Sequence, residues 1–273
     1  MTDKPLITVV TVTYNAEKCL EDTIKSVISQ TYPNIEYIII DGSSTDKTVA
    51  IIKKYQDKVS HWISEPDKGI FYAMNKGIDL ANGEWISFMN AGDCFYDNEV
   101  ISKVFKDNPT EDFIYGNTKV VYQIGKYKLN KFISPPDLKD LWKRTINHQS
   151  IFTKTSIMKS NKFIPNSPSP DSELLLKAYY KNNCTFKKVN ITIARYLGGG
   201  FSSINPYEKP LFIKYFKRRY NRWKLVKSYL NEFKVDAHYS FIITRDLLQI
   251  LILKFLPDYI RYKLFYLINR GVK

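Results

Sequence analysis

Three clusters of polar residues, each placed after a short apolar run, have the side chains needed to hold a phosphorylated ligand. They are Thr13-Tyr14-Asn15, Asp41-Gly42-Ser43-Ser44-Thr45-Asp46 and Asn90-Ala91-Gly92-Asp93. A carboxylate at the end of a strand, such as Asp41, can accept hydrogen bonds from a base or a ribose, and Asp93 can present a hard oxygen to Mn²⁺ or Mg²⁺ bridging a diphosphate. Together the clusters predict a site for a nucleoside diphosphate.

Alternating strands and helices must position these clusters. Apolar runs rich in β-branched residues predict strands at 6–13, 35–40, 61–64 and 85–89, and helical spacing predicts helices at 17–30, 47–55 and 70–81. This alternation is typical of a parallel sheet covered by helices, in which ligands bind beyond the carboxyl ends of the strands. All three clusters fall at such ends, so we expect residues 1–112 to form a nucleotide-binding half.

The alternation of predicted strands and helices ends at about residue 112. Short runs at 113–115, 119–123 and 127–132, separated by Gly116 and Gly125, predict antiparallel strands or hairpins. Further along, the spacing predicts a helix at 171–180, a strand at 185–196 and a glycine loop at 197–202. We expect residues 113–205 to form a second half of the same domain.

The net charge of +14 is concentrated at the end of the chain. Residues 201–273 hold 15 Lys and Arg against 5 Asp and Glu, a net charge of +10. Aromatic and apolar residues from Phe212 to Leu230 recur among these charges at helical spacing, which predicts an amphipathic helix. The apolar run 247–256 is too short to span a bilayer. We expect 206–273 to be a basic aromatic helical tail that contacts a membrane, with packing on its own domain or an oligomer interface as alternatives.

Several classes of protein are disfavoured by composition. The three cysteines, Cys19, Cys94 and Cys184, are scattered without the spacing of a zinc site or a disulfide framework. No basic segment followed by a long apolar run opens the chain, so no secretory signal is predicted. The basic charge lies in an amphipathic aromatic pattern without a nucleic-acid-binding motif. We therefore expect a cytoplasmic protein, peripheral at the inner face of the cell membrane, that does not bind nucleic acid.

Five motifs in combination resemble glycosyltransferase family 2. They are Thr-Tyr-Asn, Ile-Asp-Gly-Ser-Ser-Thr-Asp-Lys-Thr, Ala-Met-Asn-Lys-Gly-Ile, Ala-Asn-Gly-Glu-Trp and Phe-Met-Asn-Ala-Gly-Asp. The chain resembles the branch that makes capsule, O-antigen and colanic-acid-type polysaccharides, over about residues 6–205. The resemblance implies an α/β GT-A fold, Rossmann-like, with a mixed and mostly parallel sheet. It also implies inverting transfer of a sugar from a nucleotide diphosphate, expected to be a UDP-sugar, to a saccharide acceptor, expected to be lipid-linked, in surface polysaccharide or lipopolysaccharide synthesis.

The resemblance also assigns residues. Positions matched to nucleotide and donor binding are Thr13, Tyr14, Asp41, Ser43, Asp67, Lys68, Asn75, Asn90, Gly92 and Asp93. Asp171 matches the catalytic base that deprotonates the acceptor hydroxyl. Segments near the donor and acceptor match His148, Gln149, Gly198 and Gly199. Mn²⁺ or Mg²⁺ is implied, with Asp93 as ligand and His148 as a second, nitrogen ligand.

The sequence departs from the family pattern in the metal region. Where an acidic Asp-X-Asp is usual, this chain has Asn90-Ala91-Gly92 before Asp93, so one carboxylate remains. Phe71 stands where relatives often have Tyr and Tyr72 where they often have Asp, which removes an acidic group from the donor side.

Structural roles compete with several of these assignments. Asp41 and Asp46 could end a strand and cap a helix, Asp93 could be a turn residue, and Asp171 could be a helix N-cap. A lone histidine such as His148 is often structural. Two other functions also stay open: sugar transfer to a polyprenyl phosphate, and non-catalytic binding of a nucleotide sugar or a membrane.

Overall fold

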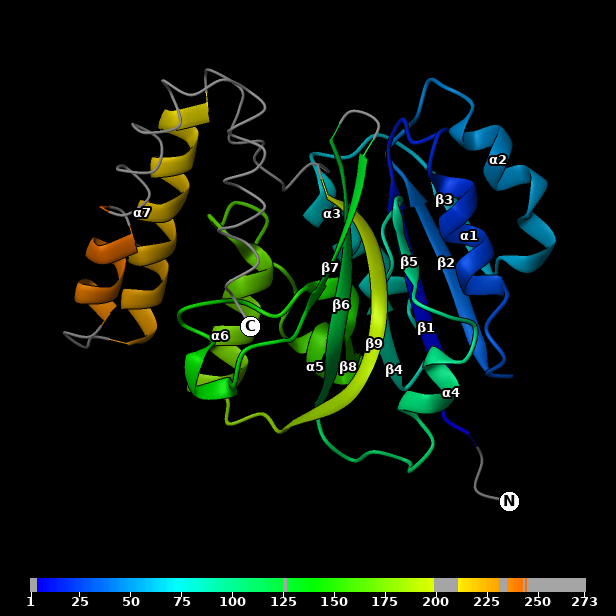
Figure 1. The fold of residues 1–273 in the computed structure, drawn as a ribbon. Helices are drawn as coiled ribbons and strands as arrows, with labels where there is room; N and C mark the ends of the chain where they lie inside the picture. The colour runs from blue at the N-terminus through cyan, green and yellow to red at the C-terminus, as the bar shows by residue number, and fades with distance from the viewer. Residues whose placement is uncertain (1–3, 125–126, 199–210, 231–234, 243, 245–273) are drawn as a thin grey trace. The chain divides into compact units, whose positions relative to one another are not determined.

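The structure is a computed structural model that describes residues 4–124, 127–198, 211–230, 235–242 and 244 (Figure 1). The chain divides into two compact units, residues 1–208 and 209–273.

A mixed sheet forms the centre of the first unit. Its strands are β1 (Ile7–Thr13), β2 (Ile35–Asp41), β3 (His61–Ser64), β4 (Trp85–Phe88), β5 (Asp93–Phe95), β6 (Phe113–Ile124), β7 (Tyr127–Ile133), β8 (Ile151–Lys154) and β9 (Phe186–Gly198). The order across the sheet is β3-β2-β1-β4-β8-β6-β9-β5, with β7 paired to β6. β1 pairs in parallel with both β2 and β4, and β8 then runs antiparallel to β4. The neighbouring strands β3, β2, β1 and β4 are therefore parallel, and the mixing of directions begins at β8.

Helices cover both faces of the sheet. They are α1 (Leu20–Ile28), α2 (Thr48–Lys54), α3 (Ile70–Leu80), α4 (Val100–Val104), α5 (Thr155–Ser160) and α6 (Pro170–Tyr180). All seven residues of β1 are buried, and they alternate between two apolar clusters. Ile7 and Val9 pack with α1, whereas Val10 and Val12 pack with α3. A strand buried on both faces explains the continuous apolar run in this part of the sequence.

The predicted break at Gly116 is wrong, because β6 continues through it. At Gly116 the pairing with β9 shifts register, and a side chain there would lie 2.7 Å from the Ile191 carbonyl oxygen. The glycine thus permits close approach of two strands and a bulge rather than a turn. Four strands and α-helices of the first unit were not predicted: α4, β5, β8 and α5, each six residues or fewer.

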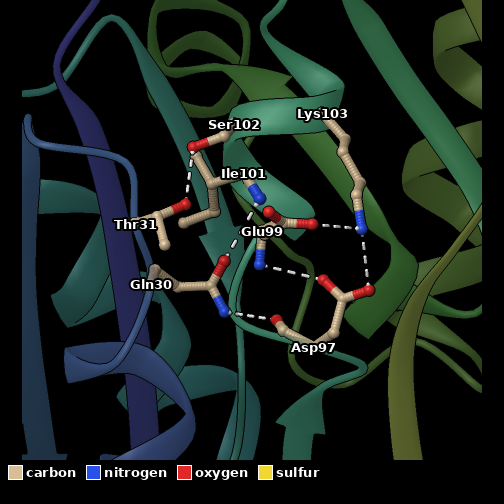
Figure 2. Close-up of polar contacts among 7 residues, drawn as sticks. All are labelled: Gln30, Thr31, Asp97, Glu99, Ile101, Ser102 and Lys103. Atoms are coloured by element: carbon tan, nitrogen blue, oxygen red, sulfur yellow. Dashed lines mark hydrogen bonds and ion pairs between the residues drawn. The ribbon is translucent and has the colours of Figure 1, made fainter.

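A polar network joins the end of α1 to the segment that follows β5 (Figure 2). The Gln30 side chain donates to the Asp97 carbonyl at 2.7 Å and accepts from the Ile101 amide at 3.2 Å. Asp97 in turn accepts from the Glu99 amide at 2.9 Å and pairs with Lys103 at 3.0 Å. These contacts fix the start of α4, and with it the chain immediately after β5.

The second unit contains α7 (Leu211–Tyr229) and a helical segment at 235–242. The Trp223 indole donates to Asp236 at 2.7 Å, and Lys227 pairs with the same carboxylate at 3.0 Å. Val226 and Val235 are fully buried. The predicted tail helix is present, whereas the apolar run 247–256 lies outside the described residues. In the described part of the chain, no helix is both long and apolar enough to cross a membrane.

Gly77 is the point at which α3 packs against β1, and its replacement gives a test of this contact. A Cβ at Gly77 would collide with the γ-methyl groups of Val10. We expect Gly77→Ala to lower the free energy of unfolding by about 1–3 kcal/mol through overpacking, although Ala favours helices. Urea denaturation measures this change.

The double variant Gly77→Ala/Val10→Ala serves as the control, because removal of the valine methyl groups leaves room for the added Cβ. The two substitutions should be less than additive. A Gly77→Ala protein more stable than the wild type would contradict this account of the packing.

Candidate active site

The three polar clusters meet at one edge of the sheet. Thr13 lies opposite Asp41 in the β1–β2 register, and the Gly42 amide donates to the Thr13 carbonyl at 2.9 Å. On the other side of β1, the Ala91 amide donates to the Val12 carbonyl at 3.1 Å. Because β2, β1 and β4 are neighbours, the loops that follow them lie next to one another.

The loops after β1 and β2 are tied together by reciprocal hydrogen bonds. The Asn15 side chain accepts from the Thr45 amide at 2.9 Å, and the Asn15 amide donates to the Ser44 hydroxyl at 2.8 Å. The Ala16 amide donates to Thr48 at 2.8 Å. Asp46 accepts from the Thr48 amide at 2.9 Å, but Lys47 rather than Asp46 occupies the N-cap position of α2.

Asp41 is fully buried and already has several donors. It accepts from the Ser44 amide at 2.9 Å and the Ser64 hydroxyl at 2.7 Å, and also from the Ser44 hydroxyl. Its carboxylate therefore fixes the conformation of the loop that follows β2 through hydrogen bonds with Ser44 and Ser64. Ser64 was not named as a functional residue, and nothing in its local sequence marks it. Ser43, which was named, is exposed and has a φ of 65°, a conformation that favours glycine.

The side chains of Tyr14 and Asp67 both lie close to Gly42. The Tyr14 side chain is 64% exposed, which leaves its ring free to stack on a ligand. A Cβ at Gly42 would be 2.8 Å from Asp67 Oδ2 and 3.4 Å from the Tyr14 ring. The other Asp67 oxygen accepts from the Gly69 amide at 2.7 Å. Lys68 is exposed beside this group.

Asn75 ties α3 to the segment before α6. Its amide donates to the Phe163 carbonyl at 2.9 Å and accepts from the Phe163 amide at 3.0 Å. Both polar atoms of the side chain thus contact protein backbone. This geometry gives Asn75 a positioning function.

Asn90, Asp93 and His148 form a compact group at the third cluster. His148 Nε2 lies 3.2 Å from Asn90 Nδ2 and 3.9 Å from Asp93 Oδ2. Burial raises the pKa of Asp93 to about 7, and burial lowers the pKa of His148. The side-chain oxygen Oδ1 of Asn90 is buried without a hydrogen-bond partner among the described residues. The group therefore lacks positive charge to balance an ionised Asp93.

This donor set fits a divalent cation. A carboxylate, an imidazole and an unsatisfied amide oxygen lie together, although the described residues contain no group of three or more His, Cys, Asp or Glu side chains. Mg²⁺ and Mn²⁺ sites commonly use few protein ligands, with phosphate and water oxygens completing the coordination.

Asp171 lies in the first turn of α6, where Ser169 occupies the N-cap position. Oδ1 of Asp171 accepts from the Ser169 hydroxyl at 3.1 Å and the Ser172 amide at 2.8 Å. Within the described chain, its Oδ2 has no hydrogen-bond partner. Asp171 and His148 line the same small cavity, together with apolar side chains such as Phe163. Because Ser169 is the N-cap residue, the N-cap interpretation of Asp171 is wrong. Oδ2 of Asp171 remains available to a ligand.

The other residues predicted for the site are Gln149, Gly92, Gly198 and Gly199. Gln149 is buried beside His148 in a short 3₁₀ turn. Gly92 has a φ of 97° and precedes Asp93, which begins β5. Gly198 ends β9, where it pairs with Tyr122, and Gly199 lies outside the described residues.

Comparison with known proteins agrees with the motifs. The sequence model described as Glycosyl transferase family 2 matches residues 8–170. A PGL/p-HBAD biosynthesis glycosyltransferase of Mycobacterium bovis is 28% identical over 159 residues, 56% of this chain and 60% of the relative. The putative teichuronic acid biosynthesis glycosyltransferase TuaG of Bacillus subtilis is 33% identical over 138 residues, 49% of this chain and 54% of the relative. The chain thus matches little more than half the length of these relatives.

Solved structures confirm the expected GT-A fold. S. aureus TarS 1–349 in complex with UDP-GlcNAc has a TM-score of 0.63 and 18% identity, covering 88% of this chain and 72% of that one. The mannosyltransferase PcManGT of Pyrobaculum calidifontis, in complex with GDP-Man and Mn²⁺, has a TM-score of 0.56 and 13% identity. The match covers 90% of this chain and 81% of PcManGT.

The raised pKa of Asp93 predicts a pH-dependent stability. Between the ordinary value of 3.8 and about 7, the folded protein binds more protons at this carboxyl than the unfolded chain, so stability falls as the pH rises. The Asp93→Asn variant should not show this decrease in stability with rising pH. In EDTA, we expect the free energy of unfolding of Asp93→Asn, relative to that of the wild type, to increase by at most about 1.4 kcal/mol per pH unit across that window.

Urea denaturation at several pH values between 4 and 8 measures the effect. Asp107→Asn, at an exposed position, is the matched control and should leave the pH dependence unchanged. If the free energy of unfolding depended on pH in the same way for Asp93→Asn and the wild type, the raised pKa of Asp93 would be contradicted.

Proposed function

Because the chain belongs to glycosyl transferase family 2, we propose that it is an inverting glycosyltransferase that transfers a sugar from a nucleotide diphosphate to a saccharide acceptor. One arrangement carries this proposal. His148 lies 3.9 Å from Asp93 and shares a cavity with Asp171, which brings the proposed metal ligand and the proposed base into one site.

The donor binds at the carboxyl edge of β1, β2 and β4. The exposed Tyr14 ring stacks on the base, and the Asp67 oxygen beside Gly42 accepts a hydrogen bond from it. Lys68, exposed next to them, balances phosphate charge. A UDP-sugar is the donor we favour, in keeping with the UDP-GlcNAc held by the structurally similar TarS.

Asp93 and His148 would hold Mn²⁺ or Mg²⁺, with the side-chain oxygen Oδ1 of Asn90 close by. A bound cation would offset charge on the departing nucleoside diphosphate. Its presence would also keep Asp93 ionised, since a nearby positive charge favours the carboxylate. Asn75 acts at a distance by holding the segment that leads into α6.

Asp171 is the base. The Ser169 hydroxyl and the Ser172 amide donate hydrogen bonds to Oδ1 of Asp171 and so fix the orientation of the carboxylate at the start of α6. The other oxygen, Oδ2, can then accept the proton of the acceptor hydroxyl. That hydroxyl oxygen attacks the anomeric carbon opposite the leaving diphosphate, the bond to the diphosphate breaks, and the anomeric configuration inverts. Ser169 therefore positions the base.

The acceptor is a lipid-linked saccharide of surface polysaccharide synthesis. Support comes from relatives named for PGL/p-HBAD biosynthesis and for teichuronic acid biosynthesis. The second unit suits a lipid surface: Tyr220 and Phe241 are 47% and 66% exposed, and Lys224 is exposed beside Tyr220. Basic and aromatic side chains together favour an anionic interface. These features support a location at the inner face of the cell membrane.

Nucleotide release tests the transfer reaction. We expect the purified protein, with membrane extract as acceptor, to release nucleotide from one member of a panel of UDP-, GDP- and dTDP-sugars when Mn²⁺ is present. Asp93→Ala and Asp171→Asn should each lower the rate at least a hundredfold, since each removes a group that acts in the transition state.

Asp107→Asn should retain the wild-type rate, because its carboxylate is exposed and it follows α4 rather than one of the strand ends that form the site. The absence of release from every donor would reject the transferase and favour non-catalytic binding. Accumulation of a lipid monophosphate sugar would instead identify transfer to a polyprenyl phosphate.

Liposome pelleting tests the membrane surface. The full-length variant Tyr220→Ser/Lys224→Gln/Phe241→Ser should pellet with anionic vesicles several-fold less than the wild type, because it loses two exposed rings and a cation. Ile164→Ser is the matched control, since Ile164 is 50% exposed in the first unit. Equal pelleting of the triple variant and the wild type would exclude this surface.

A further inference from the structure

A row of cationic and aromatic side chains crosses one face of the sheet, away from Asp93. Phe132 of β7 pairs with Lys119 of β6, Lys119 pairs with Arg195 of β9, and Arg195 pairs with Cys94 of β5. Paired positions point to the same face of a sheet, and Asp93, one residue earlier, points to the other. Tyr96 follows β5 on the same side as Cys94. We call Tyr96, Lys119, Phe132 and Arg195 the cation–aromatic surface.

The rings of this surface are open to a ligand. Tyr96 is 38% exposed and Phe132 is 58% exposed, and their centroids are 6.2 Å apart at an interplanar angle of 69°. Lys119 Nζ lies 5.8 Å from the Tyr96 centroid and 5.7 Å from the Phe132 centroid. The ammonium group thus lies beside two exposed rings.

The positive charge of the surface is not neutralised. The Arg195 side chain is exposed and has no hydrogen bond or ion pair with any described residue, and the described contacts of the Lys119 side chain include no carboxylate. The two residues are on neighbouring strands, which lie about 4.8 Å apart. Two adjacent unpaired cations favour binding of an anion.

A groove adjoins this surface. It has a volume of about 310 Å³, and Asp22, Ser29, Tyr96, Asp97, Asn98 and Arg195 are among its lining residues. Asp97 is paired with Lys103, so its charge is partly balanced, whereas Asp22 adds a carboxylate. The oxygens of these two carboxylates can accept hydrogen bonds from sugar hydroxyls.

We propose that the cation–aromatic surface and its groove bind an anionic saccharide. The apolar faces of sugar rings pack on Tyr96 and Phe132, a carboxylate or phosphate group binds Lys119 and Arg195, and hydroxyls bond to the polar groups of the groove. Phe95 of β5 also lines the groove, only two residues or roughly 7 Å of backbone from Asp93. The ligand is the distal part of the acceptor chain, an assignment that rests on the proposed transferase function.

Calorimetric titration tests binding directly. The probes are a tetrasaccharide of alternating glucuronic acid and N-acetylglucosamine, and the neutral N-acetylglucosamine tetramer, each added to the full-length protein at low salt. We expect the anionic probe to bind at least fivefold more tightly than the neutral one. Arg195→Gln and Lys119→Gln should each weaken it at least fivefold, and Phe132→Ala should weaken both probes.

Lys53→Gln is the matched control, because Lys53 is an exposed lysine of α2 remote from the surface in sequence. Unchanged thermal unfolding midpoints establish that the variants are folded. Failure of the wild type to bind the anionic probe, equal affinity for both probes, or equal weakening by Lys53→Gln would each overturn the proposal.

Nucleotide release separates the two proposals. The surface variants should retain release from the donor when water is the only acceptor, because none of their side chains lies at the donor site. Donor-dependent release without saccharide binding rejects this surface alone. Saccharide binding without release from any donor leaves the surface standing as an anionic-saccharide site and rejects the transferase.

Discussion

Parallel pairing of β1 with both β2 and β4 is the constraint on which the site depends. Because β1 is buried on both faces, α1 and α3 must cover opposite sides of the sheet, and the loops after the three strands must leave at one edge. The Gly77 contact with Val10 sets how closely α3 approaches. The edge that remains uncovered brings together residues separated by up to about 80 positions in the chain.

The environments of two buried carboxylates decide their different roles. Asp41 accepts hydrogen bonds from Ser44 and Ser64, so its charge is compensated by the protein itself. Asp93 receives little such support, and burial raises its pKa to about 7. A carboxylate buried without donors costs stability unless a cation joins it. The same residue type thus supports a loop in one place and is suited to metal binding in the other.

Local patterns were enough to predict much of the first half. The strands at 7–13, 35–41 and 61–64 and the helix at 70–80 follow from apolar runs and periodicity, with errors of about one residue at their ends. Prediction failed where tertiary contacts overrode a local signal. Gly116 resembles a turn in sequence but lies within β6, since β9 supports the chain on both sides of it. The short elements α4, β5, β8 and α5 contain too few residues for periodicity to be visible.

The sequence by itself determined the family and the chemical types at the site, because its motifs are contiguous and each follows its own strand. Only the tertiary structure decided how those residues are used. It places Asn75 against Phe163, puts Ser169 rather than Asp171 at the N-cap, and brings His148 to within 3.9 Å of Asp93. It also aligns Lys119, Phe132 and Arg195 on one face. Such relations depend on pairing between distant strands and helices, and no local pattern encodes them.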